Sequence, residues 1–258
     1  MEKMTESIKE IKEILSQVDD INSDLIAKYC DDSRTGVQKL ISQTKKRIEK
    51  LENQKASFQE RLKFERDFWS KGVEIVAGVD EVGRGPLAGP VVTCAVVLPE
   101  DFSIYEVNDS KQLSEKKRYE LASKIKENAL DYSYGIADNK LIDDINIYEA
   151  TRVAMKQAVM GLKKTPDELI VDAMQIPVEI DQLRLIKGDA KSASVSAASI
   201  LAKTYRDDLM KQYDKEYPEY DFANNAGYGT KKHLDALYKY GATPIHRKTF
   251  KPVTDLIN

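Results

Sequence analysis

Two adjacent carboxylates, Asp80 and Glu81, follow a short apolar run and precede the tripeptide Gly83-Arg84-Gly85. Carboxylate oxygens are the ligands that hard divalent cations prefer in proteins. Glycines that flank an arginine leave bare backbone N–H groups beside a positive charge, and this combination suits a phosphate or a sugar hydroxyl. These residue types at this spacing therefore predict metal-assisted chemistry on a phosphate ester.

Two later carboxylates have a similar setting. The run Leu169–Asp172 is typical of a short buried strand that ends in an acid, and Asp189 follows another short apolar run, 183–186. A single Asp at a strand end is more often a turn or cap residue than a ligand, but four such acids make a better candidate site. Converging carboxylates repel one another and raise each other's pKa unless a cation balances them. We therefore expect Mg²⁺ or Mn²⁺ as the cofactor.

Two other interpretations of the stretch 76–90 compete with a metal site. The pattern Gly83-x-Gly85-x-x-Ala88 matches a dinucleotide-binding fingerprint, but that motif must open a helix. Here Pro86 and Pro90 are followed by a β-branched run, so a nucleotide-binding protein of that kind is disfavoured. The alternative is a β-hairpin with an acidic pair that is simply solvated, and the arginine flanked by glycines weakens it.

A longer resemblance starts from the same residues. Residues 78–91, GVDEVGRGPLAGPV, are similar to the signature of type 2 ribonuclease H, the bacterial ribonuclease HII family. Six further segments resemble later motifs of that family in the same order: Asn108–Ser114, Val171-Asp172, Lys187–Asp189, Ala197–Lys203, Gly227–Thr230 and Ile245–Arg247. The resemblance covers about residues 74 to 252 and leaves the first seventy or so residues outside it.

The resemblance implies a role for each matching residue. It implies that Asp80, Glu81 and Asp172 are metal ligands, and that Asp189 joins these three as the fourth catalytic acid. A tyrosine and the Gly-Arg-Gly backbone would read the 2′-hydroxyl that distinguishes RNA from DNA. The substrate-binding residues that it implies are Gly83, Arg84, Gly85, Asn108, Ser110, Lys111 and Tyr228.

Tyr228 and two further serines each have an alternative interpretation. Tyr228 could be a buried aromatic, although Gly227 and Gly229 on either side favour exposure. Ser192 or Ser196, at the start of a long predicted helix, could hold a phosphate or could be ordinary caps.

The implied activity is that of an endoribonuclease. It would cleave the RNA strand of RNA–DNA hybrids, and the 5′ side of ribonucleotides embedded in duplex DNA, by divalent-metal-dependent hydrolysis that leaves a 3′-hydroxyl and a 5′-phosphate. The partners would be these nucleic acids. The alternative is a non-catalytic hybrid-binding module of the same fold; loss of Asp80, Glu81 or Asp172 would favour it, and none of them is lost.

The elements that must position these residues form an α/β pattern. Strands are predicted within 74–99, at 132–137, 169–172 and 183–186, and helices after Ser114, from Asn146 to Leu162 and over 193–213. The resemblance narrows this to a ribonuclease H-like mixed five-stranded sheet flanked by helices, with a helical C-terminal part.

The N-terminal residues lie outside the resemblance. Apolar stripes at helical spacing, Ile8–Leu25 and Val37–Leu62, predict two antiparallel helices. We therefore expect a helical N-terminal extension at 1–70 and a catalytic domain at 71–258. The extension either packs on the body or self-associates, or it holds nucleic acid through Lys45, Lys46, Arg47 and Lys50.

Composition limits the remaining classes. In 258 residues, 32% are charged, and no apolar segment is long enough to span a bilayer. The two cysteines, Cys30 and Cys94, suit a reducing compartment, so we expect a cytoplasmic protein. We also expect a monomer with no membrane partner. With only His233 and His246 besides them, a cysteine–histidine metal site is excluded. The net charge of −3 argues weakly against nucleic acid, but basic clusters recur along the chain, so charge leaves this question open.

Overall fold

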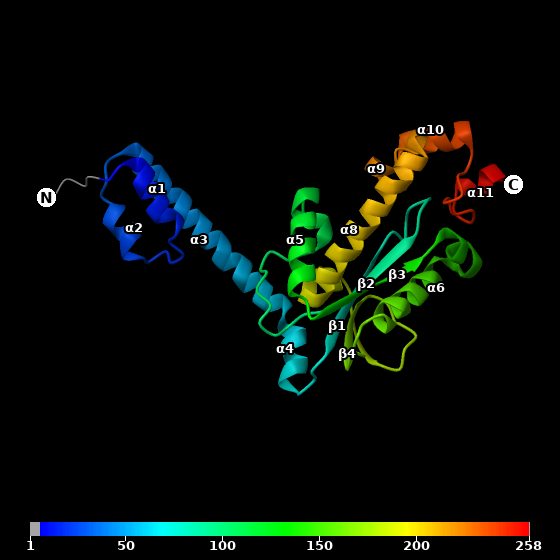
Figure 1. Cartoon of the computed structure of the whole chain (residues 1–258), viewed down its shortest axis with the longest axis horizontal. Coiled ribbons are helices and arrows are strands. Elements are labelled where there is room, and N and C mark those ends of the chain that lie inside the picture. Colours follow the sequence, from blue (N-terminus) through cyan, green and yellow to red (C-terminus); the bar gives the residue numbers. More distant parts are fainter. Residues whose placement is uncertain (1–5, 258) are drawn as a thin grey trace. The chain divides into compact units, whose positions relative to one another are not determined.

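The computed structural model describes residues 6–257 and divides into two compact units, Met1–Gln59 and Glu60–Asn258 (Figure 1). The second unit is built on one sheet with the strand order β3-β2-β1-β4-β5. Its strands are β1 (Val76–Val82), β2 (Val91–Val97), β3 (Asp131–Ala137), β4 (Glu168–Asp172) and β5 (Asp181–Leu185). The first three pair antiparallel, whereas β1 with β4 and β4 with β5 pair parallel. The predicted mixed five-stranded sheet is therefore confirmed.

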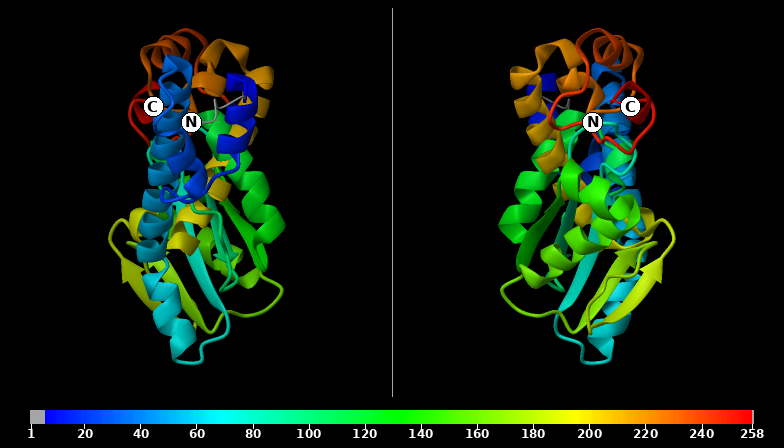
Figure 2. Two further views of the ribbon diagram at one scale, coloured as in Figure 1. Left: turned by 90° about the vertical axis from the view of Figure 1, so that its left-hand side faces the viewer. Right: turned by 90° about the vertical axis from the view of Figure 1, so that its right-hand side faces the viewer.

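Helices cover both faces of this sheet, as the two views of Figure 2 show. Successive side chains along β1 alternate between the faces. Ala77 and Val79 enter a core with α6 (Asn139–Met160), and Val76 packs with Val195 of α8 (Ala193–Glu216). The contact with α8 is very close at Gly78, where a Cβ would lie 2.2 Å from the Ser194 carbonyl carbon.

The remaining helices of the second unit are short. They are α4 (Lys63–Ser70), η1 (Ser110–Gln112), α5 (Glu115–Asn128), α7 (Gly188–Lys191), η2 (Pro218–Tyr220), α9 (Phe222–Asn225), α10 (Lys231–Tyr240) and α11 (Val253–Ile257). Two caps predicted from sequence are present. The Ser114 hydroxyl accepts the Lys117 N–H, and Asn146, at a break inside α6 with φ 68°, accepts the Tyr148 N–H through its side chain.

The first unit has three helices within its described residues, where the sequence predicted two: α1 (Ile8–Ser16), α2 (Asp24–Tyr29) and α3 (Thr35–Arg61). The first predicted helix is interrupted because Ser23 caps a new one by accepting the Leu25 N–H. These helices share a core of their own, formed by Ile11, Leu15, Val18, Ile26, Tyr29, Val37, Ile41 and Ile48. Residues 1–5 of the predicted extension lie outside the described part.

The segment after α3 belongs by contacts to the second unit. Phe64, Phe68 and Trp69 of α4 pack against the cluster that contains Val76 and Val195. The two compact units are divided after Gln59, eleven residues before the predicted boundary. The predicted division at residue 70 stays a prediction. Over the described range 6–257, no helix has the length and apolar character needed to cross a membrane.

Candidate active site

The parallel pairing of β1 with β4 brings the first three acids to the same end of the sheet, towards the C-terminal ends of these two strands. Val79 lies opposite Val171, so Asp80 and Asp172 follow this pair on neighbouring strands. The structure differs from expectation in one respect: β1 continues to Val82 by pairing with β2, so Asp80 and Glu81 lie inside the strand rather than at its end. Their side chains consequently leave opposite faces of β1. Asp80 faces α8, and the Ser199 side chain on that helix acts to lower the pKa of Asp80.

The buried acids raise one another's pKa. Burial raises the pKa of Asp80 well above its ordinary value, and the neighbouring Glu81 and Asp172 charges add to this rise. The pKa of Glu81 is also raised, chiefly by burial, with the Arg84 charge opposing the rise. Burial raises the pKa of Asp172 against the hydrogen bond from the Gly188 N–H. Three carboxyls that interact in this way form one electrostatic cluster.

The fourth acid adjoins this cluster through α7. The Gly188 N–H donates to Asp172 Oδ1 at 2.8 Å, and Asp189 follows in the same short helix. Asp189 is buried, and its Oδ2 lies 3.3 Å from Lys111 Nζ. The Lys111 charge also acts on Glu81 and Asp172. The structure therefore brings all four predicted acids into the neighbourhood of a single lysine.

The donor set suits a hard divalent cation. Arg84 Nη1 lies 3.6 Å from Glu81 Oε1, but Glu81 Oε2 is buried and has no hydrogen-bond partner. A cation beside these oxygens would favour the charged carboxylates and offset both the burial and the repulsion that raise the three pKa values. Within residues 6–257 no three His, Cys, Asp or Glu side chains already converge as a metal site, so the fit rests on donor chemistry and charge.

Two buried arginines, Arg206 and Arg247, donate hydrogen bonds to carbonyls of the loop after β1. The sequence did not predict this role for either. Gly83 has φ +94°, and a Cβ there would lie 2.2 Å from Arg206 Nε, so only glycine fits. Arg206 donates to the carbonyls of Pro90 at 2.9 Å and Ala88 at 3.2 Å. Its pKa falls to about 10 through burial.

The second arginine holds the Gly-Arg-Gly segment itself. Arg247 donates to the carbonyls of Gly83 at 2.5 Å and Arg84 at 2.8 Å, and to that of Gly89 at 2.9 Å. Burial and the neighbouring Arg206 lower its pKa to about 9. In a trans peptide the N–H points opposite to the C=O. The N–H groups of Arg84 and Gly85 therefore point away from this buried guanidinium.

Tyr228 lies against the same loop. Its Cε1 would be 3.4 Å from a Cβ on Gly85, and its side chain is 49% exposed. The Leu87 N–H donates to the Gly227 carbonyl at 2.9 Å, which fixes the two segments to each other. The alternative of a buried aromatic is therefore wrong, and the structure brings Gly83, Arg84, Gly85 and Tyr228 together.

The predicted phosphate-binding residues are less uniform. Lys111 has a 78% exposed side chain, and Asn108 donates to Gln112 at the surface. Ser110 is buried, and its hydroxyl lies 3.0 Å from that of Ser199, so it stands behind Asp80 rather than at the surface. Its contact with a phosphate stays a prediction.

The two serines at the start of α8 are buried and already bonded. Ser192 accepts the Val195 N–H and donates to Glu65, and Ser196 donates to the Asp189 carbonyl. They therefore act as caps and local supports.

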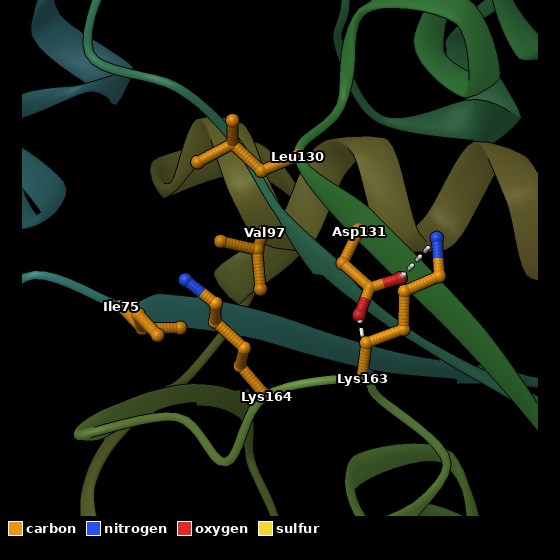
Figure 3. Close-up of a pocket in the computed structure, with 6 residues that line it drawn as sticks. All are labelled: Ile75, Val97, Leu130, Asp131, Lys163 and Lys164. Atoms are coloured by element: carbon orange, nitrogen blue, oxygen red, sulfur yellow. Dashed lines mark hydrogen bonds and ion pairs between the residues drawn. The ribbon is translucent and has the colours of Figure 1, made fainter.

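A cavity of about 240 Å³ lies at the other end of the sheet (Figure 3). It opens beside the start of β1 and the end of β2, and its lining residues are Ile75, Val97, Leu130, Asp131, Lys163 and Lys164. Because Asp80 lies in the C-terminal half of β1 and Asp172 is the last residue of β4, this cavity at the start of β1 is separate from the carboxylate cluster.

Comparison with known proteins identifies the family of this chain. A family model described as ribonuclease HII matches residues 77–253, and one described as the ribonuclease HII N-terminal domain matches residues 7–69. The ribonuclease HII of Ligilactobacillus salivarius is 60% identical over 257 residues, which cover 100% of this chain and 99% of that protein. That of Lactobacillus delbrueckii subsp. bulgaricus is 58% identical, with 97% of each chain covered.

Solved structures share the fold. The ribonuclease H2 of Pyrococcus horikoshii OT3 is 30% identical with a TM-score of 0.62, over 71% of this chain and 97% of that one. A Bst ribonuclease HIII solved in complex with Mn²⁺ is 19% identical with a TM-score of 0.53, over 71% of this chain and 69% of that one, and supports the fold alone. On the match of the family model and the full-length relatives, the chain belongs to the ribonuclease HII family.

Proposed function

We propose that the carboxylate cluster and the facing Gly83–Gly85 loop form the site at which this ribonuclease HII hydrolyses RNA paired with DNA. Family membership makes the chain an endoribonuclease that acts on RNA–DNA hybrids. The observation that supports this location is that the three acids with raised pKa values lie beside a loop whose N–H groups point away from the buried Arg247. Cleavage on the 5′ side of a ribonucleotide leaves a 3′-hydroxyl and a 5′-phosphate.

In this proposal, Asp80, Glu81 and Asp172 hold Mg²⁺ or Mn²⁺, and Asp189 is the fourth acid. A bound divalent cation supplies an activated water and stabilises the leaving oxygen. The unpartnered Glu81 Oε2 and the raised pKa values of all three carboxyls support these ligands.

The chain's own groups select and orient the substrate. The Arg84 and Gly85 N–H groups donate to the 2′-hydroxyl or to the adjacent phosphate, and the Tyr228 ring stacks on the sugar. Lys111 and Asn108 hold the phosphate backbone, with Ser110 supporting Ser199 behind Asp80. DNA lacks the 2′-hydroxyl and offers these donors only a phosphate, so we expect cleavage to require a ribonucleotide.

We further infer a cytoplasmic monomer that acts on hybrids and on duplex DNA containing single ribonucleotides. Cys30 and Cys94 are both free, which suits a reducing compartment. Gel filtration at micromolar concentration tests the monomer.

The decisive experiment uses a DNA duplex that carries one ribonucleotide, with Mg²⁺ or Mn²⁺ present, and maps the cut. We expect one cut on the 5′ side of the ribonucleotide. Asp80→Asn should abolish cleavage and leave duplex binding largely intact, because phosphate contacts supply most of the affinity. Near-wild-type cleavage by this variant would remove Asp80 from the metal site. A cut in the all-DNA control would contradict recognition of the 2′-hydroxyl.

A further inference from the structure

Two histidines are buried together beneath the Tyr228 loop. His233 of α10 is 0% exposed and His246 of the C-terminal segment is 1% exposed, and their Nε2 atoms lie 2.9 Å apart. Two neutral imidazoles can share this hydrogen bond only if one nitrogen donates and the other accepts. Their remaining nitrogens decide which is which.

The outer partners fix both tautomers. The Nδ1 atom of His233 lies 2.8 Å from the Tyr228 carbonyl, which can only accept, so this Nδ1 carries a proton. The Nδ1 atom of His246 receives the Thr243 backbone N–H at 2.9 Å, so this Nδ1 is bare. A neutral imidazole carries one proton, and therefore His246 Nε2–H donates to the bare Nε2 of His233.

The surroundings keep both rings neutral. Phe222 packs edge-on against His233 with ring centroids 5.2 Å apart, and Tyr220 packs on His246 at 5.3 Å. Burial lowers the pKa of His233, and burial together with His233 lowers that of His246 to about 4. Among the described residues, Tyr220 from η2 packs on both rings, and no carboxyl group contributes to the pKa shift of either histidine.

We infer that His233 and His246 are positioning residues. The two neutral rings form a chain of hydrogen bonds, here called the relay, that runs from the Thr243 N–H to the Tyr228 carbonyl and fixes Tyr228 over Gly85. The relay ends on the backbone of an exposed aromatic that faces the Gly-Arg-Gly loop. At its other end, the segment that carries His246 pairs with Ala88 of that same loop. The inference rests on the proposed role of Tyr228 as the residue that reads the ribonucleotide sugar.

The tautomers are tested directly by ¹⁵N NMR of the histidine-labelled full-length chain at pH 7.5. We expect His233 in the Nδ1–H form and His246 in the Nε2–H form, with His246→Gln assigning the two signals. The opposite tautomer on either ring, or a charged ring at this pH, would overturn the relay. This measurement does not depend on activity.

Positioning is tested by a double-mutant cycle with Tyr228→Ala on the single-ribonucleotide duplex. His233→Leu keeps the volume and removes the donor, so kcat/KM should fall roughly five-fold, mainly through KM. In the Tyr228→Ala background the same change should cost nothing further. An equal loss in both backgrounds would show that His233 supports the fold generally, and would overturn the inference.

Conservative and control variants complete the cycle. His233→Asn keeps an N–H donor at the Nδ1 position and should restore most of the lost kcat/KM. Tyr238→Leu, on the same helix with a 62% exposed side chain, should behave as wild type. If Tyr228→Ala alone leaves kcat/KM unchanged, the proposed role of Tyr228 fails and the positioning role fails with it. If Tyr228→Ala is impaired but His233→Leu is not, the relay alone is refuted.

Discussion

The ring and the hydroxyl of Tyr228 make separable contributions. Tyr228→Phe keeps the stacking face and loses one hydroxyl, so we expect a loss of about 1 kcal/mol in transition-state binding. Tyr228→Ala should cost more, and mostly on duplexes with a single ribonucleotide, where the junction sugar is the only RNA feature. Kinetics on both substrate types measure this. Equal losses on long hybrids and single-ribonucleotide duplexes would contradict recognition of that sugar.

Protonation of the buried histidines should destabilise the fold in acid. In the unfolded chain His246 has the ordinary histidine pKa of 6.5, whereas in the folded chain its pKa is about 4. The unfolded state therefore binds more protons between these values, and the free energy of unfolding falls as pH falls from 6.5 to 4. The contribution of His246 is at most about 3 kcal/mol.

The difference between wild type and His246→Gln isolates this effect. The raised pKa values of Asp80, Glu81 and Asp172 act with the opposite sign, because the folded state then binds more protons, and they are common to both proteins. Urea unfolding from pH 7 to pH 4.5 should show the wild-type advantage shrinking as pH falls. A difference that stays constant with pH would show that His246 has the same pKa in the folded and unfolded states.

Some site residues could be predicted from the sequence, and others could not. Asp80, Glu81 and Gly83–Gly85 stand next to each other in one motif, so their association needed no tertiary contact to be predicted. Arg206 carried no such sign, because an arginine in an amphipathic sequence ordinarily reaches solvent, and the motif Ile245–Arg247 gave Arg247 no role. Only the fold shows that both face carbonyls of the loop. The burial of Ser110 was not predicted for the same reason, since its contact with Ser199 depends on α8.

At the level of elements, the guanidinium groups set the shape of the loop. Arg247→Lys keeps the charge but cannot reach the carbonyls of Gly83, Arg84 and Gly89 together. We expect a loss of about 2 kcal/mol in stability, because buried carbonyls are left without their donors. The KM should rise as the loop loosens, while metal-dependent cleavage persists at saturating substrate.

The matched control is Arg184→Lys, an exposed arginine on β5. Thermal unfolding and steady-state kinetics of the two variants make the comparison. A wild-type melting temperature in Arg247→Lys would mean that a single ammonium suffices to hold the loop.

Elements with strong local signals were predictable, and those set by packing were less so. β2 is a β-branched run between two prolines, and Asn146 predicted the restart of α6, which begins earlier, at Asn139. The extension of β1 through Asp80 and Glu81 was missed, because it depends on pairing with β2. The break between α1 and α2 was missed because the apolar stripe continues across it, although α1 ends at Ser16 and Ser23 caps a new helix.

At the scale of the whole molecule, the first unit has an uneven charge distribution. Residues 35–59, which form most of α3, contain six basic and two acidic residues, whereas residues 1–34 contain five basic and nine acidic ones. Arg47 is already bonded to the Leu15 carbonyl at 3.1 Å, and so it supports α1 rather than offering a free phosphate contact. Lys46 and Lys50 are exposed and remain the better candidates for a nucleic-acid backbone.

These lysines make the role of the first unit testable by salt dependence. Lys46→Gln and Lys50→Gln together should reduce the slope of log affinity against log salt by about 0.9 for each lysine–phosphate ion pair that the substitutions remove. Turnover at saturating substrate should not change, because binding that is equal in ground and transition states affects affinity rather than the chemical step. Neutralising Lys9 and Lys12 of α1 in the same way is the control and should leave the slope as it was.

Deletion of residues 1–59 extends the same test to the whole unit. This unit has its own core, and every proposed catalytic residue lies in 60–258, so the remaining chain should fold and cleave. Ending the deletion at Gln59 retains Glu65, whose carboxylate accepts the Ser192 and Ser194 hydroxyls at 2.6 Å and supports the start of α8. The truncated chain should show the shallow salt slope of the double lysine variant. Full affinity with an unchanged slope would exclude a substrate-binding extension, and loss of turnover would instead make the first unit part of the catalytic fold.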